Sequence, residues 1–199
     1  MQREDWDRRY AGVESLWSAK PNRFLVAEVA ELTPGRALDL ACGEGQNAIW
    51  LAGLGWKVLG VDYSEVALAR ARARAARQGV EAEFLAADLL DFEPQPDVHD
   101  LVLVLYLHLP ADDRRVVLDR ASRAVAPAGT FLLLGHDLLN LTEGVGGPSD
   151  PALLCTPDDI AAEVPGLEIE KAERVLRDVA DADRPAVDVL VRARRASRV

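Results

Sequence analysis

The chain has 199 residues, which suits one domain with a sizeable core. Hydrophobic residues make up 49% and charged residues 28%, as in soluble globular proteins, and no apolar run is long enough to span a membrane. The net charge of −10 argues against a nucleic-acid partner, because phosphate binding needs clustered Lys and Arg.

The first residues are charged and include no apolar segment of the kind found in signal peptides, so we expect a cytoplasmic protein. Cys42 and Cys155 lie far apart, and the three histidines have no zinc-site spacing. We therefore expect neither a metal site nor a disulfide.

Short apolar runs alternate with helical stretches, which is typical of a parallel sheet with crossover helices. Residues 3–31 are predicted to be mostly helical. The predicted strands are 36–41, 57–62, 82–88, 101–107 and 129–136, and the predicted helices between them are 46–54, 65–78 and 111–126. Ser64 and Gly79 provide the N-cap and the left-handed C-terminal glycine of the long helix 65–78.

The last third of the chain is predicted to be less regular. Residues 137–155 are rich in Gly and Pro and long for a connection, as lids and binding loops often are. Thr156 and Pro157 favour the start of a short helix over 157–163. Residues 167–179 and 186–195 then predict an antiparallel pair of strands at one sheet edge.

The stretch ALDLACGEGQNA (37–48) leads from a strand through small residues into a helix. Such a turn presents backbone N–H groups and the positive end of a helix. Gly43 and Gly45 lack a Cβ, so a ligand can approach the main chain closely. Without further residues, this pattern is also compatible with a tight turn that binds nothing.

Two more acids stand where a nucleoside would need them. Asp62 lies 19 residues after Gly43, at the end of a strand, where a carboxylate can accept hydrogen bonds from both ribose hydroxyls. Asp88 follows the next strand and could accept a bond from an exocyclic amino group. Ligands of open α/β sheets bind at the carboxyl ends of the strands.

GEGQNA also fits a loose G-x-G-x-x-A pattern, so a dinucleotide is an alternative ligand. Asp39 favours a different cofactor, because its charge would repel a pyrophosphate. A cofactor that carries an ammonium and a sulfonium would tolerate this acid or be attracted by it.

With these residues, the chain resembles the class I S-adenosylmethionine-dependent methyltransferases. DLACGEG resembles their motif I, GVDYS (60–64) motif II, AADLLDF the adenine-contacting segment, DLVLVLYLHLP motif IV, and APAGTFLLLGHD (126–137) the turn and fifth strand. NAIWLAGLGWKVLGVDYS is similar to the tellurite-resistance-like and thiol methyltransferase-like subgroup. Asn47 departs from the family, where a third glycine is common.

The resemblance implies an α/β fold: a Rossmann-like three-layer sandwich with a seven-stranded, mostly parallel sheet and an antiparallel C-terminal strand. It implies a single domain over 1–199, with an N-terminal helical cover at 1–31 and a core at 36–195. It also implies S-adenosylmethionine as the cofactor. The implied cofactor-binding residues are Asp39, Ala41, Gly43, Gly45, Asp62, Tyr63, Asp88, Leu89 and, through its carbonyl, Leu105. Trp17 and Phe24 are implied as walls under the cover, although Trp17 would serve equally well as a core aromatic.

Methyl transfer from a sulfonium needs a general base only if the acceptor arrives protonated. His108 and His136 end the strands of motif IV and of the fifth strand, so they are candidate bases, and Tyr106 is a weaker candidate beside the acceptor. His99 is expected at the surface. The stretch 137–155 is expected to close over the acceptor, with Asn140 pointing inward.

Three functions are compatible with these residues. We favour methyl transfer to a small-molecule thiol, hydroxyl, amine or chalcogen oxyanion, because a small acidic domain without an inserted recognition module suits a small acceptor. The alternatives are a nicotinamide-dependent oxidoreductase and a non-catalytic S-adenosylmethionine binder.

Overall fold

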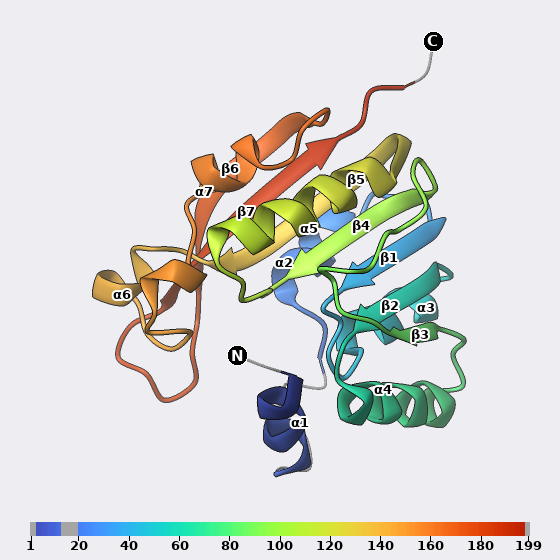
Figure 1. Ribbon diagram of the computed structural model, residues 1–199, viewed down its shortest axis with the longest axis horizontal. Helices are drawn as coiled ribbons and strands as arrows, with labels where there is room; N and C mark the ends of the chain where they lie inside the picture. The colour runs from blue at the N-terminus through green and yellow to red at the C-terminus, as the bar shows by residue number, and fades with distance from the viewer. Residues whose placement is uncertain (1–2, 13–19, 198–199) are drawn as a thin grey trace. The chain divides into compact units, whose positions relative to one another are not determined.

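The computed structural model describes residues 3–12 and 20–197 (Figure 1). Its strands form one sheet in the order β3-β2-β1-β4-β5-β7-β6. The strands are β1 (Arg36–Leu40), β2 (Lys57–Asp62), β3 (Glu83–Ala86), β4 (His99–Leu105), β5 (Val125–His136), β6 (Glu168–Arg177) and β7 (Ala186–Arg194). The helices are α1 (Arg3–Ala11), α2 (Arg23–Val29), α3 (Gln46–Gly53), α4 (Glu65–Gln78), α5 (Ala111–Ala124), α6 (Asn140–Glu143) and α7 (Pro157–Ala162), with a 3-10 turn η1 (Pro151–Leu153). The predicted seven-stranded, mostly parallel Rossmann-like sheet is confirmed.

The chain forms two compact units, Met1–Glu93 and Pro94–Val199, which we describe one at a time. The single domain predicted over 1–199, with its cover and core, stays a prediction.

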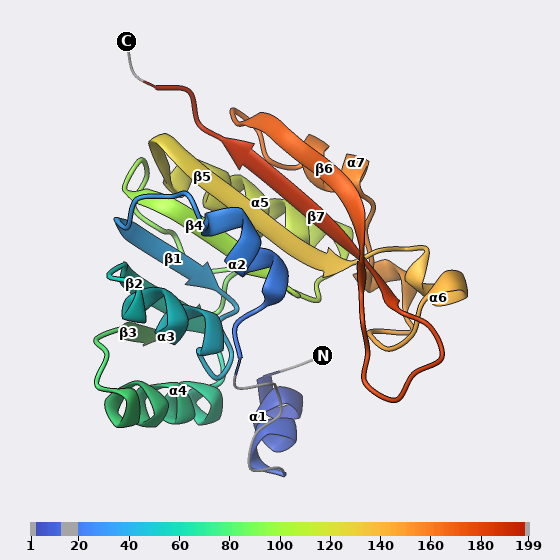
Figure 2. The same cartoon turned by 180° about the vertical axis from the view of Figure 1, so that it is seen from behind.

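The first unit contains a parallel sheet of β1, β2 and β3. Helix α3 packs against β1 and β2, which it overlies in Figure 2, and α4 packs against α3, β2 and β3. Ala67, Leu68, Ala71 and Ala75 of α4 are buried, and their spacing places them on one face of the helix. The Ser64 hydroxyl accepts from the N–H of Ala67, and Gly79 is left-handed, so both predicted caps are confirmed.

The second unit joins β4 and β5 in parallel, and β5, β7 and β6 in antiparallel pairs. Helix α5 packs against β4 and β5 and lies in front of them in Figure 1. β4 is buried from Leu101 to Leu105, as expected for a strand covered on both faces. The predicted hairpin of the last two strands is confirmed, with β6 at the edge and largely exposed.

Several boundaries differ from the sequence prediction. β5 begins at Val125 instead of 129, because Val125 already pairs with His99 at the start of β4. His99 is therefore buried, and its predicted place at the surface is wrong. Ala128 takes a left-handed conformation with φ 61°, which glycine adopts more readily than alanine. The irregular stretch 137–155 includes α6 and η1, whereas α7 begins at Pro157 behind a Thr156–Asp159 capping box, as predicted.

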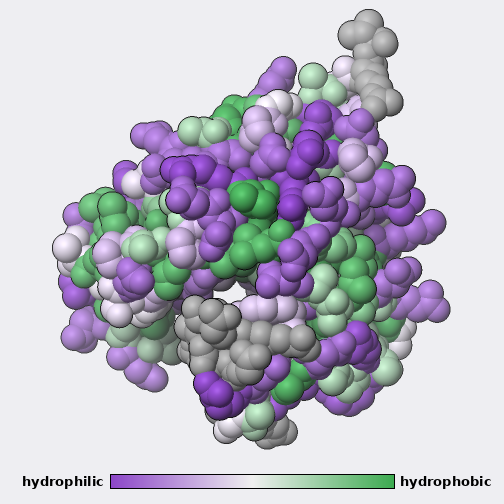
Figure 3. Space-filling model, viewed as in Figure 1, coloured by the Kyte–Doolittle hydropathy of each residue, from purple (hydrophilic) through white to green (hydrophobic). Residues whose placement is uncertain are grey.

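The surface of the described residues is mainly hydrophilic on the face drawn in Figure 3, with smaller hydrophobic clusters. None of the helices in the described part of the chain is long and apolar enough to cross a membrane.

Candidate functional site

The turn between β1 and α3 has an unusual backbone. Ala41, Gly43 and Gly45 all have positive φ angles, of 59°, 54° and 73°. At Gly45 a Cβ would come within 2.9 Å of the Ala71 Cβ and of Phe84 Cε1, so packing alone requires glycine there. Ala41 carries a Cβ, which makes its positive φ strained. Residues other than glycine that keep a positive φ are often found at functional sites.

Asp62 ties this turn to the end of β2. Its Oδ2 accepts from the N–H of Gly43 at 2.8 Å, and its Oδ1 accepts from the N–H of Ser64 at 2.9 Å. The side chain is buried. Burial raises the pKa of Asp62, while hydrogen bonds from backbone N–H groups oppose the rise. Asp62 and Gly43, which the sequence prediction assigns to one cofactor site, are therefore in direct contact, and their role in binding a cofactor stays a prediction.

Asp39 lies inside the same unit with only 1% of its surface exposed. Burial and, to a lesser extent, the charge of Asp62 raise its pKa to about 7, against the effect of a hydrogen bond from the Ala48 backbone. Within the described residues, its Oδ2 atom has no hydrogen-bond partner. A buried carboxyl with an unused acceptor and a second acid nearby is stabilised in its charged form by a cation.

Asp88 and Leu89 lie in the turn after β3, since that strand ends at Ala86 and not at 88 as predicted. The carboxylate of Asp88 is exposed and accepts from the N–H of Leu90 at 2.9 Å. Leu89 is buried and Tyr63 is half-buried. Contacts of these residues with an adenine stay a prediction.

The N-terminal segment is attached to this unit through contacts of Ser64 and Asn47 that the sequence prediction did not include. The hydroxyl of Ser64 bonds to Asp7 of α1 at 2.5 Å, and α1 packs against α4. Asn47 is buried, and its Oδ1 accepts from the N–H of Asn22 at 2.9 Å, just before α2. A polar residue in the place of the usual third glycine was the signal for this contact. Trp17 lies outside the described residues, and Phe24 is half-buried.

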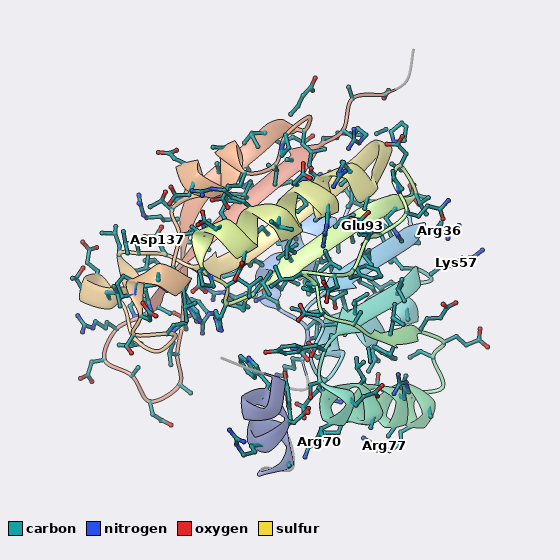
Figure 4. The ribbon with its side chains drawn as sticks, in the orientation of Figure 1. Arg36, Lys57, Arg70, Arg77, Glu93 and Asp137 are labelled. Carbon is teal, nitrogen blue, oxygen red and sulfur yellow. The ribbon has the colours of Figure 1, made fainter. Side chains whose placement is uncertain are left out.

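Charged side chains of α4 contribute to the same turn. Arg70, which is labelled with Arg77 on α4 in Figure 4, reaches Glu44 of the turn at 2.9 Å. The Glu44 side chain is fully buried, so this ion pair fixes the turn to the helix. Arg36 and Lys57 are the first residues of β1 and β2 and pair in register there, at the other end of β2 from Asp62.

The second unit has its own polar cluster at the ends of its strands, made by Tyr106, His136, Arg177 and Asp188. Asp188 of β7 is fully buried and lies opposite His136 in the β5–β7 register. Its Oδ1 is 3.1 Å from His136 Nδ1, and its Oδ2 accepts from the Tyr106 hydroxyl at 2.8 Å and from Arg177 Nε at 2.6 Å. Burial raises the pKa of Asp188, but these hydrogen bonds outweigh it and hold the pKa below its ordinary value.

The two candidate bases lie together in this unit. The rings of His108 and His136 stack with centroids 5.5 Å apart and an angle of 18° between their planes. Tyr106 has φ 56°, an uncommon conformation for an aromatic residue. The sequence prediction missed Asp188 and Arg177, because nothing in a single strand pattern shows which residue lies opposite His136.

The remaining predicted residues of this unit are Leu105 and Asn140. Leu105 is the buried last residue of β4, and the role of its carbonyl stays a prediction. The Asn140 side chain is buried: its Nδ2 donates to the Gly146 carbonyl at 2.7 Å and its Oδ1 accepts from the Val187 N–H at 2.8 Å, and its predicted place beside an acceptor stays a prediction. It thus holds the loop 140–147 against β7. Asp137, labelled in Figure 4 just after β5, accepts from the Leu139 N–H at 2.7 Å in the same loop.

Comparisons with known proteins agree with this arrangement. Residues 37–129 match the model of a methyltransferase domain. A ribosomal RNA small subunit methyltransferase C of Alcanivorax borkumensis is 36% identical over 51% of this chain and 30% of its own length. A demethylmenaquinone methyltransferase of Thermus thermophilus is 36% identical over 62% of this chain and 55% of its own length. The chain therefore spans about half or less of these relatives.

One solved structure matches almost the whole chain. It is described as "Conversion of a Disulfide Bond into a Thioacetal Group during Echinomycin Biosynthesis", is 28% identical, and superimposes with a TM-score of 0.78. The match covers 99% of this chain and 93% of that one.

Proposed function

We propose that this chain is a class I S-adenosylmethionine-dependent methyltransferase, and that it transfers a methyl group from that cofactor to a small-molecule nucleophile; the match of residues 37–129 to a methyltransferase domain supports this. The unused, buried Oδ2 of Asp39 is the observation that carries the proposal. A cationic ligand in this unit would supply the charge that the buried carboxyl needs.

The residues of the first unit fit the cofactor. Asp39 and the backbone at Ala41 and Gly43 would hold its cationic amino-acid end. Asp62 would accept from the ribose hydroxyls, and the two backbone donors orient its carboxylate and oppose the rise of its pKa. Tyr63, Asp88 and Leu89 would contact the adenine.

S-adenosylmethionine supplies, when bound, a methyl group on a positively charged sulfur. The chain contributes binding, orientation and exclusion of water, and good orientation alone can remove about 7–11 kcal/mol of the barrier. Gly45 and the Glu44–Arg70 pair contribute by fixing the turn. Asp7 and Asn47 attach the N-terminal segment to it.

Sulfur is the acceptor atom that we place first, in agreement with the thiol methyltransferase-like subgroup. The description of the echinomycin protein names a reaction at sulfur, and its structure matches almost this entire chain. The net charge of −10 also disfavours an RNA acceptor, although one relative is an rRNA methyltransferase.

A screen of small thiols, phenols, amines and chalcogen oxyanions, read by release of S-adenosylhomocysteine, tests the proposal. Release with at least one acceptor, and more with thiols than with amines, is expected. Cofactor binding without product across the panel would favour a non-catalytic binder. Binding of a nicotinamide dinucleotide in place of S-adenosylmethionine would favour an oxidoreductase.

A further inference from the structure

The polar cluster of the second unit fixes one side of the His136 ring. Nδ1 of His136 faces Oδ1 of Asp188 at 3.1 Å, and the two residues are direct cross-strand partners on β5 and β7. A carboxylate can only accept hydrogen bonds, so Nδ1 must be the nitrogen that carries the proton. In the neutral ring, Nε2 is then left with a lone pair.

The carboxylate of Asp188 is itself held from its other side. Its Oδ2 accepts from the Tyr106 hydroxyl and from Arg177 Nε, and Arg177 Nε also lies 3.1 Å from the Tyr106 oxygen. The residue after β4 and one residue each from β6 and β7 thus form a network that sets the direction of the carboxylate. The positive φ of Tyr106 shows that the end of β4 adopts an uncommon conformation in making this contact.

The ring of His136 is also confined on its faces. His108 stacks on it, and a Cβ placed on Gly147 would come within 2.9 Å of His136 Cγ. Among the described residues, Nδ1–Asp188 is the hydrogen bond that this ring makes, so Nε2 remains available. A ring whose rotation is blocked and whose tautomer is fixed is oriented for proton transfer.

We propose that His136 is the general base for an acceptor bearing a thiol or phenolic hydroxyl, and that Asp188 is the residue that positions it, with Tyr106 and Arg177 orienting Asp188. The inference rests on the function proposed above. Nε2 removes the proton of the acceptor S–H or O–H, and the electron pair left on the acceptor forms the bond to the methyl carbon. The bond from that carbon to the cofactor sulfur breaks, and its electron pair stays on the sulfur. The proton remains on Nε2, where the imidazolium is stabilised by the Asp188 carboxylate, until water removes it.

The alternative is a structural network that only joins the strands of this unit. It predicts the same tautomer of His136 but no effect that depends on the acidity of the acceptor. The first of two measurements tests the tautomer and needs neither cofactor nor acceptor, and the second separates the alternatives.

The first measurement is ¹⁵N–¹H NMR of the full chain labelled at its three histidines, with His136→Gln identifying the His136 signals. We expect a protonated Nδ1 and an unprotonated Nε2 in the neutral ring. In Asp188→Asn, Tyr106 and Arg177 still donate toward the Oδ2 position, so the amide oxygen is held there. The NH₂ group then faces Nδ1 and reverses the tautomer. A wild-type ring protonated at Nε2 would overturn the inference, whether or not the variant folds.

The second measurement is turnover with a series of thiols and phenols of increasing acidity, read by S-adenosylhomocysteine release. Asp188→Asn and His136→Gln should lose about 10²–10⁴-fold with weakly acidic acceptors. With an already ionised acceptor such as a nitrophenol, the loss should fall below about tenfold. Glu173→Gln is the control, since Glu173 is exposed on β6 and lies outside the polar cluster. Its turnover should stay within about twofold of wild type.

The outcomes separate this inference from the function on which it rests. Absence of cofactor binding by the wild type would overturn both. Methylation of amines alone, or an equal loss for acidic and weakly acidic acceptors, would overturn the base and leave methyl transfer intact. A tautomer that reverses in Asp188→Asn together with an acidity-dependent loss would establish both roles.

Discussion

Replacement of Asp39 by Asn should stabilise the ligand-free protein at pH 8 and impair cofactor binding. The folded protein raises the pKa of this carboxyl from 3.8 to about 7, so it keeps a proton that the unfolded chain loses. Wild-type stability therefore falls as pH rises through this window. A difference of about three pH units corresponds to about 4 kcal/mol above pH 7, at about 1.36 kcal/mol per unit. Asparagine resembles the neutral acid and avoids this cost.

Urea denaturation of wild type and Asp39→Asn at pH 5 and pH 8, without ligand, checks this. The stability gain of the variant should be about 2 to 3 kcal/mol larger at pH 8, because only part of the ionisation cost applies at pH 5. Glu81→Gln, at an exposed position of the same unit, is the matched control and should show no such widening. An equal gain at both pH values would contradict the inference that burial raises the pKa of the Asp39 carboxyl.

The same carboxyl should make cofactor binding depend on pH. Because the cationic cofactor prefers the ionised form, binding below pH 7 must release the proton of Asp39. The affinity of wild type for S-adenosylmethionine should then rise about 20- to 30-fold from pH 5.5 to 7.5. Calorimetry over this range checks the rise, and Asp39→Asn should flatten it while binding at least about tenfold more weakly at pH 7.5.

Three further substitutions test the first unit. Asp62→Asn should raise the dissociation constant of S-adenosylmethionine by about 10–150-fold, measured by calorimetry, because its NH₂ group replaces one acceptor; an unchanged constant would remove the ribose assignment. Asn47→Ala should cost about 1 kcal/mol and speed hydrogen exchange at the Asn22 N–H, and unchanged exchange would show that this contact does not hold the N-terminal segment. Gly45→Ala should lower stability in denaturant by about 2–5 kcal/mol through its positive φ and its clash with Ala71, so a loss under about 1 kcal/mol would contradict this packing.

The sheet could be predicted from sequence because each of its elements carries its own local signal. The run KVLGVD matches β2 at both ends, and Ser64 and Gly79 mark the limits of α4. The start of β5 could not be predicted, since Val125 joins the sheet through its pairing with His99 and not through its own neighbours. The same pairing buries a histidine that the polar residues around it had placed at the surface.

The residues of the candidate site likewise differ in whether a local sequence signal marks them. Asp62 and Gly43 could be assigned together because a strand end and a turn have recognisable sequences, and the structure joins them by a hydrogen bond. Asp188 and Arg177 could not, because their function depends on antiparallel register across β5, β7 and β6. The reason for Gly45 also had to come from the structure, in which Phe84 and Ala71 fill the space that a ligand was expected to need.

Calorimetric titration of the wild-type chain with S-adenosylmethionine, and separately with a nicotinamide dinucleotide, tests the central claim most directly. Saturable heat with S-adenosylmethionine, with an affinity at least about tenfold weaker in Asp39→Asn and unchanged in Glu81→Gln, is the expected result. Heat with the dinucleotide and none with S-adenosylmethionine would contradict the account.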